Sequence, residues 1–590
     1  MSVVPQGRSV QTLYRDFREG NLLVNRKYQR KLVWTIPEKQ ALIDSILKGY
    51  PIPLILFAER PEVHGRGKFE IIDGIQRLNA IFNFIDNAFD YNGNYFDVSE
   101  FARAKQAAES NIFEAAKGVP LLAKQDCANY LDYQLAVTVY PTSDESKITD
   151  VFGRINSGGR QLSYQEQRQA GVVSDFAKVV RTVASEIRGD VSKDLLLLSE
   201  MPEISVDTAK EPHGYGIKAE QTFWCKQGVL SIKQLRESED EQTIADIAAS
   251  IIGKKPFPFS KELLDRCYDR DSVDGKEIEK QLATYGSEKL AKEIKACFSV
   301  LKQAIEDTSD APNYLRSKVR PGTAYPIKAP FYAIFMAFFH LLVDKKKSPD
   351  QPQKIMGALA DLDDKLEKGT HYETTENRQK NINLTTGLIQ NFFVDKVPPA
   401  LGHGPSLVID FENALRRSRI ETPRYEFKQG ILQLDSKRAI EKDLLTRLAE
   451  TACGIANLGP DSDGYIFLGV ADRKAHAERI NQLDGITYRQ IADQFLVGID
   501  REAKILKITV EDYLKKIVSS FQNGPISEPL KSHLLSSFDA ITVHGLTTIR
   551  IKVPAQKDVS FVSGKAYSRE GSTTIQIEGQ RLVALTKLFH

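Results

Sequence analysis

The segment Phe69–Ile81, FEIIDGIQRLNAI, predicts a β-strand that turns directly into an α-helix. Its first four residues form a short, mostly apolar run, which is typical of a buried strand. From Gln76 onward, apolar side chains recur at helical spacing as far as Phe89. Asp73-Gly74 stands between the two patterns, where glycine permits a tight turn and a close backbone approach. This order of strand, turn and helix indicates a module that mixes α and β structure.

The start of the expected helix has the chemistry of a phosphate site. Its first N–H groups have no intrahelical partner and lie at the positive end of the helix dipole. Arg77 adds a guanidinium suited to bidentate binding of phosphate. Asp73 is placed to orient a metal-bound or nucleophilic water. Strand-to-helix turns with Asp-Gly are also common without any ligand, so the residues alone leave both interpretations open.

Further elements are expected on both sides of this turn. Apolar spacing predicts a helix around Leu42–Leu47, and Leu54–Phe57 is a strand candidate. A helix expected over about 145–155 ends at the breaker Asn156–Gly159. The next helix is expected to begin with the capping box at Ser163–Glu166.

Three blocks of the N-terminal region resemble a known family. They are VNRKYQRKLVWTIPEKQALIDSILKGYPIPLILF (24–57), IIDGIQRLNAI (71–81) and DVFGRINSGGRQLSYQEQRQA (150–170). In this order they resemble the DGQQR family, which has a ParB/sulfiredoxin-like fold and includes the N-terminal module of modification-dependent restriction enzymes. The resemblance covers about residues 10–175. It implies binding or hydrolysis of a nucleoside triphosphate, in some members coupled to the sensing of modified DNA.

The resemblance also implies particular residues. Asp73 and Arg77 become the catalytic candidates, and Ile75 departs from the family, which usually has Gln there. For Trp34, packing in the core is an equal alternative to a ligand role, as it is for Tyr28. The segment Asn156–Gly159 is equally well explained as a helix stop. The nucleotide-binding candidates are Tyr28, Gln29, Arg30, Gly74, Gln76, Asn156 and Gly159.

A second constellation lies in IETPRYEFKQG (420–430). Glu421, Glu426 and Lys428 bring two carboxylates and an amine together, a set that can bind a divalent metal and steady a phosphate. By itself this spacing is more often a solvated face. Its context is a helix ending TACGIANLG (451–459), then DGYIFLGVADR (463–473), and later KAYSREGSTT (565–574).

Together these segments resemble the Schlafen AlbA-type domain over about residues 410–580. Its members include metal-dependent RNases and nucleic-acid-binding proteins. In the nuclease branch, the resemblance implies that Glu421, Glu426 and Asp472 hold Mg²⁺ or Mn²⁺ and that Lys428 contacts the scissile phosphate. Ala471 replaces the first aspartate of the usual pair, and Pro460–Asp463 interrupts the usual turn.

Basic residues flank this second constellation. Their position beside the motif favours contacts with a nucleic-acid backbone, and a tyrosine among them is suited to stacking on a base. The alternative for each is a solvated surface charge. The nucleic-acid-binding candidates are Arg416, Arg417, Arg419, Arg424, Lys565, Tyr567 and Arg569.

The chain is therefore expected to be an α+β multidomain protein. Residues 1–175 form the ParB/sulfiredoxin-like module, 176–400 a mainly helical domain with the linker Lys396–Pro405, and 401–590 the Schlafen AlbA-like domain. In the last domain, a helix is expected from Lys437 to Asn457 and a buried strand at Tyr465–Val470. Ile549, Ile551 and Val553 alternate with Arg550 and Lys552, which predicts a strand with one basic face.

Composition limits the remaining possibilities. Lys and Arg total 80 against 78 Asp and Glu, so a nucleic-acid surface has to be a local patch. The five cysteines show no zinc or disulfide spacing, which favours a reducing compartment. The N-terminus lacks a secretory apolar region, and Ala329–Val343 is too short to span a bilayer comfortably, so we expect a cytoplasmic protein without a membrane segment.

Three functions remain to be compared. The leading hypothesis is an anti-phage defence effector of restriction type, in which nucleotide binding or hydrolysis at the N-terminal module controls metal-dependent cleavage of DNA or RNA at the C-terminal one. A second is a non-catalytic nucleic-acid-binding regulator. A third is a DNA nickase with its active site in the N-terminal module. The sequence leaves open the nucleotide, any DNA modification sensed, defence-system partner proteins and a homo-oligomeric state.

Overall fold

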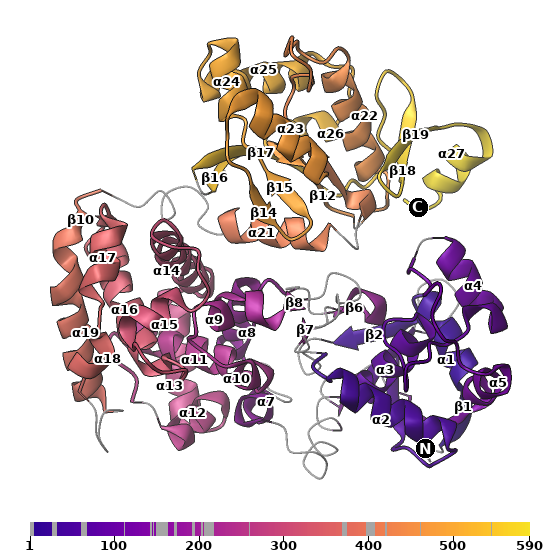
Figure 1. The fold of residues 1–590 in the computed structure, drawn as a ribbon, viewed down its shortest axis with the longest axis horizontal. Coiled ribbons are helices and arrows are strands. Elements are labelled where there is room, and N and C mark those ends of the chain that lie inside the picture. Colours follow the sequence, from indigo (N-terminus) through magenta and orange to yellow (C-terminus); the bar gives the residue numbers. More distant parts are fainter. Residues whose placement is uncertain are drawn as a thin grey trace. The chain divides into compact units, whose positions relative to one another are not determined.

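The computed structural model separates into two compact units, Met1–Pro405 and Ser406–His590, and each is described by itself (Figure 1). Of the predicted linker Lys396–Pro405, only its first residue belongs to the described part of the chain. The residues described are 5–25, 32–60, 68–110, 112–141, 144, 147–148, 151, 163–169, 174–190, 195–201, 204–205, 217–258, 260–367, 374–396, 407–418, 422–460, 462–543 and 545–589.

The described residues of the first unit include a six-stranded mixed sheet. Its spatial order is β1 (Gln6–Ser9), β5 (Gln134–Tyr140), β3 (Ile55–Arg60), β4 (Lys68–Asp73), β2 (Leu22–Asn25) and β6 (Leu195–Leu197). The pairs β3–β5 and β2–β4 are parallel, and the other pairs are antiparallel. Apolar side chains of this sheet pack with α1 (Val10–Arg18), α2 (Ile36–Leu47) and α3 (Ile75–Ile85) in one core.

Local sequence explains where these helices begin and end. Thr35 and Glu38 form a capping box at the start of α2. The helix ends at Leu47, with Lys48 as its C-cap, before Gly49 with a φ of +69°. The predicted strands at residues 54–57 and 69–72 are β3 and β4. α3 ends at Ile85, before Phe89, because Asn87 takes a left-handed φ of 57° that no helix continues. Of the helix expected over 145–155, residues 147, 148 and 151 are described as helical.

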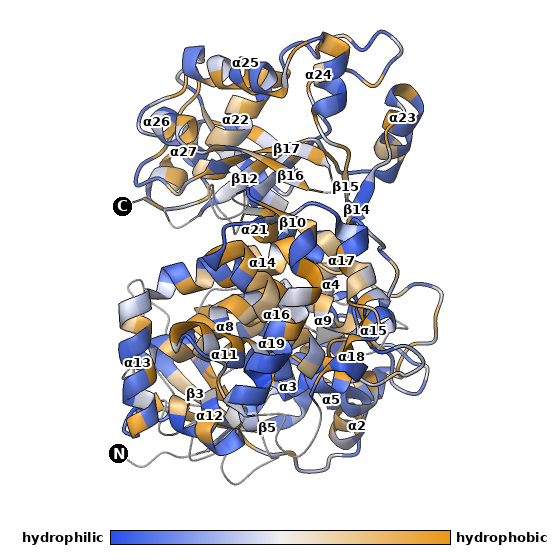
Figure 2. Ribbon diagram, turned by 90° about the vertical axis from the view of Figure 1, so that its left-hand side faces the viewer, coloured by the Kyte–Doolittle hydropathy of each residue, from blue (hydrophilic) through white to orange (hydrophobic). Residues whose placement is uncertain are grey.

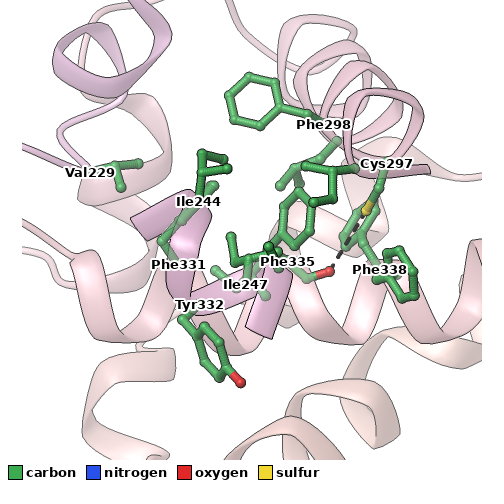
Figure 3. Packing of buried hydrophobic residues seen from close by; sticks show 14 of the residues in the cluster. Val229, Ile244, Ile247, Cys297, Phe298, Phe331, Tyr332, Phe335 and Phe338 are labelled. Atoms are coloured by element: carbon green, nitrogen blue, oxygen red, sulfur yellow. Dashed lines mark hydrogen bonds between the residues drawn. The ribbon is translucent and has the colours of Figure 1, made fainter. Parts of the chain in front are cut away.

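The middle of the chain is mainly helical and has a core of its own. Its main helices include α8 (Asp175–Arg188), α11 (Glu239–Ile252), α14 (Ser287–Glu306), α16 (Lys328–Phe339) and α19 (Thr375–Ile389). Figure 3 shows aromatic side chains of α16, Phe331, Phe335 and Phe338, packed with Ile244, Cys297 and Phe298. α16 is largely hydrophobic in Figure 2, as expected for a buried core helix. Among the described residues, no helix is long and apolar enough to cross a membrane.

The chain passes more than once between the sheet core and the helical core. α7 (Tyr164–Gln169) contacts the helical core: the Gln165 amide donates to the Tyr268 hydroxyl at 2.9 Å. After α8, the chain returns to the sheet as β6, which pairs with β2. An element before residue 175, α7, thus contacts the helical core, and an element after it, β6, belongs to the sheet. The domain boundary expected near residue 175 stays a prediction.

In the described part of the second unit, four strands form a sheet in the order β11 (Tyr425–Lys428), β12 (Gly464–Leu468), β17 (Leu546–Val553) and β16 (Phe538–Val543). The β11–β12 pair is parallel and the others antiparallel. One face packs on α22 (Leu444–Ala456) and α25 (Val510–Asn523), and the other on α21 (Leu407–Arg417). A hairpin of β18 (Ala566–Glu570) and β19 (Thr573–Ile577) lies against α22.

The expected alternation along residues 549–553 is confirmed. Ile549, Ile551 and Val553 are fully buried, whereas Arg550 and Lys552 pair with Asp539 and Asp463 on the other face. The helix expected within residues 437–457 begins later than predicted, at Leu444. Residues 431–441 fold back on themselves instead, with the N–H of Gln433 bonded to the carbonyl of Ala439 at 2.8 Å.

Candidate nucleotide and nucleic-acid sites

The turn between β4 and α3 requires glycine at position 74. Gly74 has a φ of +100°, a conformation that L residues with side chains rarely adopt. A Cβ at this position would stand 2.4 Å from Cδ1 of Ile55, a fully buried side chain of β3. Both constraints show that the turn accepts only glycine at this position.

Arg77 is largely engaged inside the protein. One terminal nitrogen donates to Asp73 Oδ2 at 2.8 Å, and the other to the carbonyls of Leu54, at 3.1 Å, and Pro53. The side chain is 12% exposed. A guanidinium has five N–H donors, so few remain for an anion. Arg77 thus connects the turn to the segment that precedes β3. This structural role differs from the expected one, bidentate binding of a phosphate.

Gln76 also makes internal contacts. Its Oε1 accepts hydrogen bonds from the backbone N–H groups of Val33, at 3.1 Å, and Trp34, at 3.4 Å. Trp34 packs against the core of the sheet, in line with the core alternative for this residue. The structure therefore assigns Gln76 to holding the chain just before α2.

The structure brings together the contiguous part of the predicted nucleotide site. Asp73, Gly74, Gln76 and Arg77 lie within one turn, where Asp73 Oδ1 also accepts the Gly74 N–H at 2.7 Å. The other nucleotide-binding candidates lie outside the described residues: Tyr28, Gln29, Arg30, Asn156 and Gly159.

A buried ionic cluster in the same sheet was not foreseen from the sequence. Glu70, on β4, is fully buried; it forms an ion pair with Arg60 of β3 and accepts a hydrogen bond from the Asn25 amide of β2 at 3.0 Å. A buried charge of this kind needs such partners. The cluster joins three neighbouring strands at one level of the sheet. A glutamate inside the apolar run FEIID was the signal for it.

In the second unit, Glu426 is held between two cations. Its Oε1 lies 2.7 Å from Lys428 Nζ, and its Oε2 lies 2.9 Å from a terminal nitrogen of Arg569. Glu426 is 13% exposed and Arg569 1% exposed. Arg569 also donates to the carbonyls of Tyr425, at 3.0 Å, and Pro423, at 3.2 Å. A cation that binds Glu426 must share or displace these partners.

The predicted metal set is not complete within the described residues. Asp472 follows β13 (Val470–Ala471), is half exposed, and lies 3.3 Å from Nδ1 of His476. In the described ranges, no three His, Cys, Asp or Glu side chains are grouped so as to hold a metal ion. Glu421 lies outside those ranges, so the set that includes it stays a prediction. Ala471 is buried among apolar residues, which explains why a carboxylate would be costly at that position.

Two of the nucleic-acid-binding candidates lie inside the domain. Tyr567 is 8% exposed and its hydroxyl donates to Glu450 at 3.0 Å; burial, reinforced by Glu450, raises the pKa of Tyr567 to about 12. Because Tyr567 and Arg569 are buried and bonded, the expected base stacking by Tyr567 and backbone contact by Arg569 do not fit the structure. Lys565 is exposed, and Arg416, Arg417 and Arg424 are partly exposed, whereas Arg419 lies outside the described residues.

A second buried network fixes the end of β11, beyond Lys428. Arg501 donates to Asp484 at 2.7 Å and to the carbonyl of Gln429 at 2.6 Å. Glu502 accepts the N–H of Ile431 at 2.7 Å and the hydroxyl of Tyr513 at 2.7 Å. Arg501 and Glu502 lie about 70 residues beyond Gln429 and Ile431 in the chain, so no local motif pointed to these contacts.

Comparison with known proteins gives two matches, one in each unit. Residues 10–173 match the family model described as GmrSD restriction endonuclease, N-terminal domain, and residues 421–578 match the one described as Schlafen, AlbA_2. Neither match extends over half of the chain. No curated protein and no solved structure matches it. The chain is thus similar to GmrSD restriction endonucleases in its N-terminal region and to Schlafen AlbA_2 domains in its C-terminal region, and both similarities point to a nuclease of restriction type.

Proposed function

We propose that this protein is a restriction-type defence effector that couples a nucleoside triphosphate at the Asp73–Arg77 turn to cleavage of DNA or RNA at β11 of the second unit. The observation that carries the proposal is the coexistence, in one chain, of a helix N-terminus without a side-chain cap at a glycine-dependent turn and a strand that presents Glu426 beside Lys428. The two family matches support the same pairing of domains.

The N-terminal half of the proposal rests on the turn. The N–H groups at the start of α3 and the dipole of this helix favour an anion such as a phosphate. No side chain caps the start of this helix. Asp73 is the candidate for orienting a water, and a ParB/sulfiredoxin-like fold is the proposed framework.

The C-terminal half rests on the glutamate and the lysine of β11. Lys428 is the proposed contact for the phosphate, and Glu426 is proposed to act with Glu421 and Asp472. When bound by these carboxylates, Mg²⁺ or Mn²⁺ would supply a Lewis acid at the phosphate. Arg569 holds Glu426 in place from the interior. The basic residues that remain accessible, such as Lys565, would contact the backbone.

The deciding experiment is cleavage of labelled single- and double-stranded DNA and RNA by the full chain, with Mg²⁺ or Mn²⁺ and with or without ATP and GTP. Glu426→Gln and Asp73→Asn are compared with two controls at exposed positions, Glu570→Gln and Asp132→Asn. We expect Glu426→Gln to abolish cleavage and Asp73→Asn to remove the effect of the triphosphate. Loss of cleavage in Asp73→Asn with full activity in Glu426→Gln would instead place the nuclease in the N-terminal module.

One observation favours a second function, a non-catalytic nucleic-acid-binding regulator. Both oxygens of Glu426 already have a cationic partner, as in a structural ion pair. This function predicts that Glu426→Gln leaves the affinity for nucleic acid unchanged and that no substrate is cut under any of these conditions. Electrophoretic mobility shift with the same oligonucleotides measures that affinity.

A further inference from the structure

The segment Val33–Glu38, here called the junction segment, contacts both cores of the first unit. Val33 packs against the helical core, and its neighbour Trp34 packs against the core of the sheet. The backbone N–H groups of both residues are bonded to Oε1 of Gln76. One side chain of the Asp73–Arg77 turn therefore holds the chain at the point where it passes from one core to the other.

The other end of the junction segment is bonded to the helical core. Glu38 closes the capping box of α2, where its Oε2 accepts the N–H and the hydroxyl of Thr35, each at 2.8 Å. The same oxygen accepts a hydrogen bond from Arg236 at 3.0 Å. Arg236 is the last residue of α10 (Ile232–Arg236), which is followed directly by α11.

α10 leads into the centre of the helical core. Within two residues of Arg236, the Gln234 amide donates to Glu239 at 3.2 Å, and Glu239 pairs with Lys328 at the start of α16 at 2.9 Å. Hydrogen bonds and an ion pair thus connect the turn, the junction segment, α10 and α16 without a gap. Arg236 and Glu38 are both partly exposed, so a substitution there can break the link without opening a core.

We infer that the junction segment transmits the occupancy of the Asp73–Arg77 turn to the helical core, with Gln76 and Arg236 as positioning residues at its two ends. The inference rests on the proposed function, because it takes a nucleoside triphosphate as the ligand of the turn. An anion bound at the start of α3 interacts with the backbone near Gln76 and so affects the position of the Gln76 side chain. A shift of that side chain changes the hydrogen bonds to Val33 and Trp34, and Arg236 passes the change to α10. Coupling of this kind requires a contiguous physical connection whose balance the ligand alters.

The test uses hydrogen exchange of the full chain with and without ATP or GTP, read at residues 232–252. We expect the triphosphate to slow exchange there about fivefold or more, the usual lower range for coupled sites. Arg236→Ala should bind the nucleotide with unchanged affinity and lose this slowing, and Arg236→Lys should recover part of it. Glu38→Gln, which keeps a capping-box side chain but removes the charge, should behave like Arg236→Ala. Lys226→Ala, which breaks an exposed ion pair with Asp310, is the matched control and should behave like the wild type.

Each outcome separates this inference from the proposed function. Slowing that persists in Arg236→Ala, or nucleotide binding without slowing in the wild type, overturns the inference and leaves the nuclease assignment standing. Slowing that depends on Arg236 in a protein that cuts nothing supports the inference and removes the nuclease. If the wild type binds neither ATP nor GTP, both the inference and the N-terminal half of the proposed function fail.

Discussion

The two candidate sites are built in different ways. The turn around Gly74 is made by one contiguous segment, whose strand, glycine and helix follow each other in the sequence. The site at Glu426 depends on Arg569, which lies more than 140 residues further along the chain and reaches back from β18. A site of the first kind is visible in local sequence, whereas a site of the second kind is visible only after folding. Substitutions at the two sites test this contrast, and their expected effects range from about 4 to about 1 kcal/mol.

Replacing Arg569 by Met is expected to have the largest effect. It removes a buried cation and leaves Glu426 and the carbonyls of Pro423 and Tyr425 without that partner, which we expect to cost about 4 kcal/mol. Denaturant unfolding, followed by a spectroscopic signal that comes from the second unit alone, measures this loss in its free energy of unfolding. Arg581→Met, on the exposed helix after the same hairpin, is the control and should change stability little. If Arg569→Met loses as little stability as Arg581→Met, then Arg569 does not hold Glu426 in place, and the contrast between the two sites fails.

Gly74→Ala tests the site that local sequence builds. The left-handed φ and the contact with Ile55 together should destabilise the first unit by about 3 kcal/mol. Gly118 has a φ of +67° with open space around its position, so Gly118→Ala isolates the backbone strain and should cost about 1 kcal/mol. Equal losses in the two variants, measured by thermal unfolding, would show that the contact with β3 does not constrain the turn.

The same contrast explains which parts of the structure could be predicted. The strand, the Asp-Gly turn and the start of α3 follow from residue order, and the alternation of Ile549 and Ile551 with Arg550 gave the correct buried face. The bonds of Gln76 could not be predicted, because they depend on how the chain packs after residue 31. For Tyr567, a basic neighbourhood suggested an exposed stacking ring, whereas the packing of the hairpin on α22 buries it.

Glu70→Gln should have an intermediate effect, since it removes the charge from the cluster that joins β2, β3 and β4. Arg60 is partly exposed and can be hydrated in the variant, so we expect a loss of about 2 kcal/mol rather than more. The exposed neighbour Glu59, in Glu59→Gln, serves as the control and should be close to neutral. The measurement is denaturant unfolding of the first unit. A neutral result for Glu70→Gln would mean that the pairing of the strands, rather than the cluster, fixes β2.

The smallest effect is expected for Tyr567→Phe, which removes one hydrogen bond to Glu450 and should cost about 1 kcal/mol at neutral pH. Its pH dependence is the sharper test. Burial and Glu450 raise the pKa of Tyr567 to about 12 from an ordinary value of 10.0, so the folded protein keeps this proton longer than the unfolded chain does. The corresponding stability is fully present below pH 10 and is lost as the pH rises toward 12. The free energy of unfolding of the wild type should therefore fall more steeply with pH in this range than that of Tyr567→Phe. Parallel pH profiles for the two proteins would indicate that the ring is hydrated, and the base-stacking role of Tyr567 would again be open.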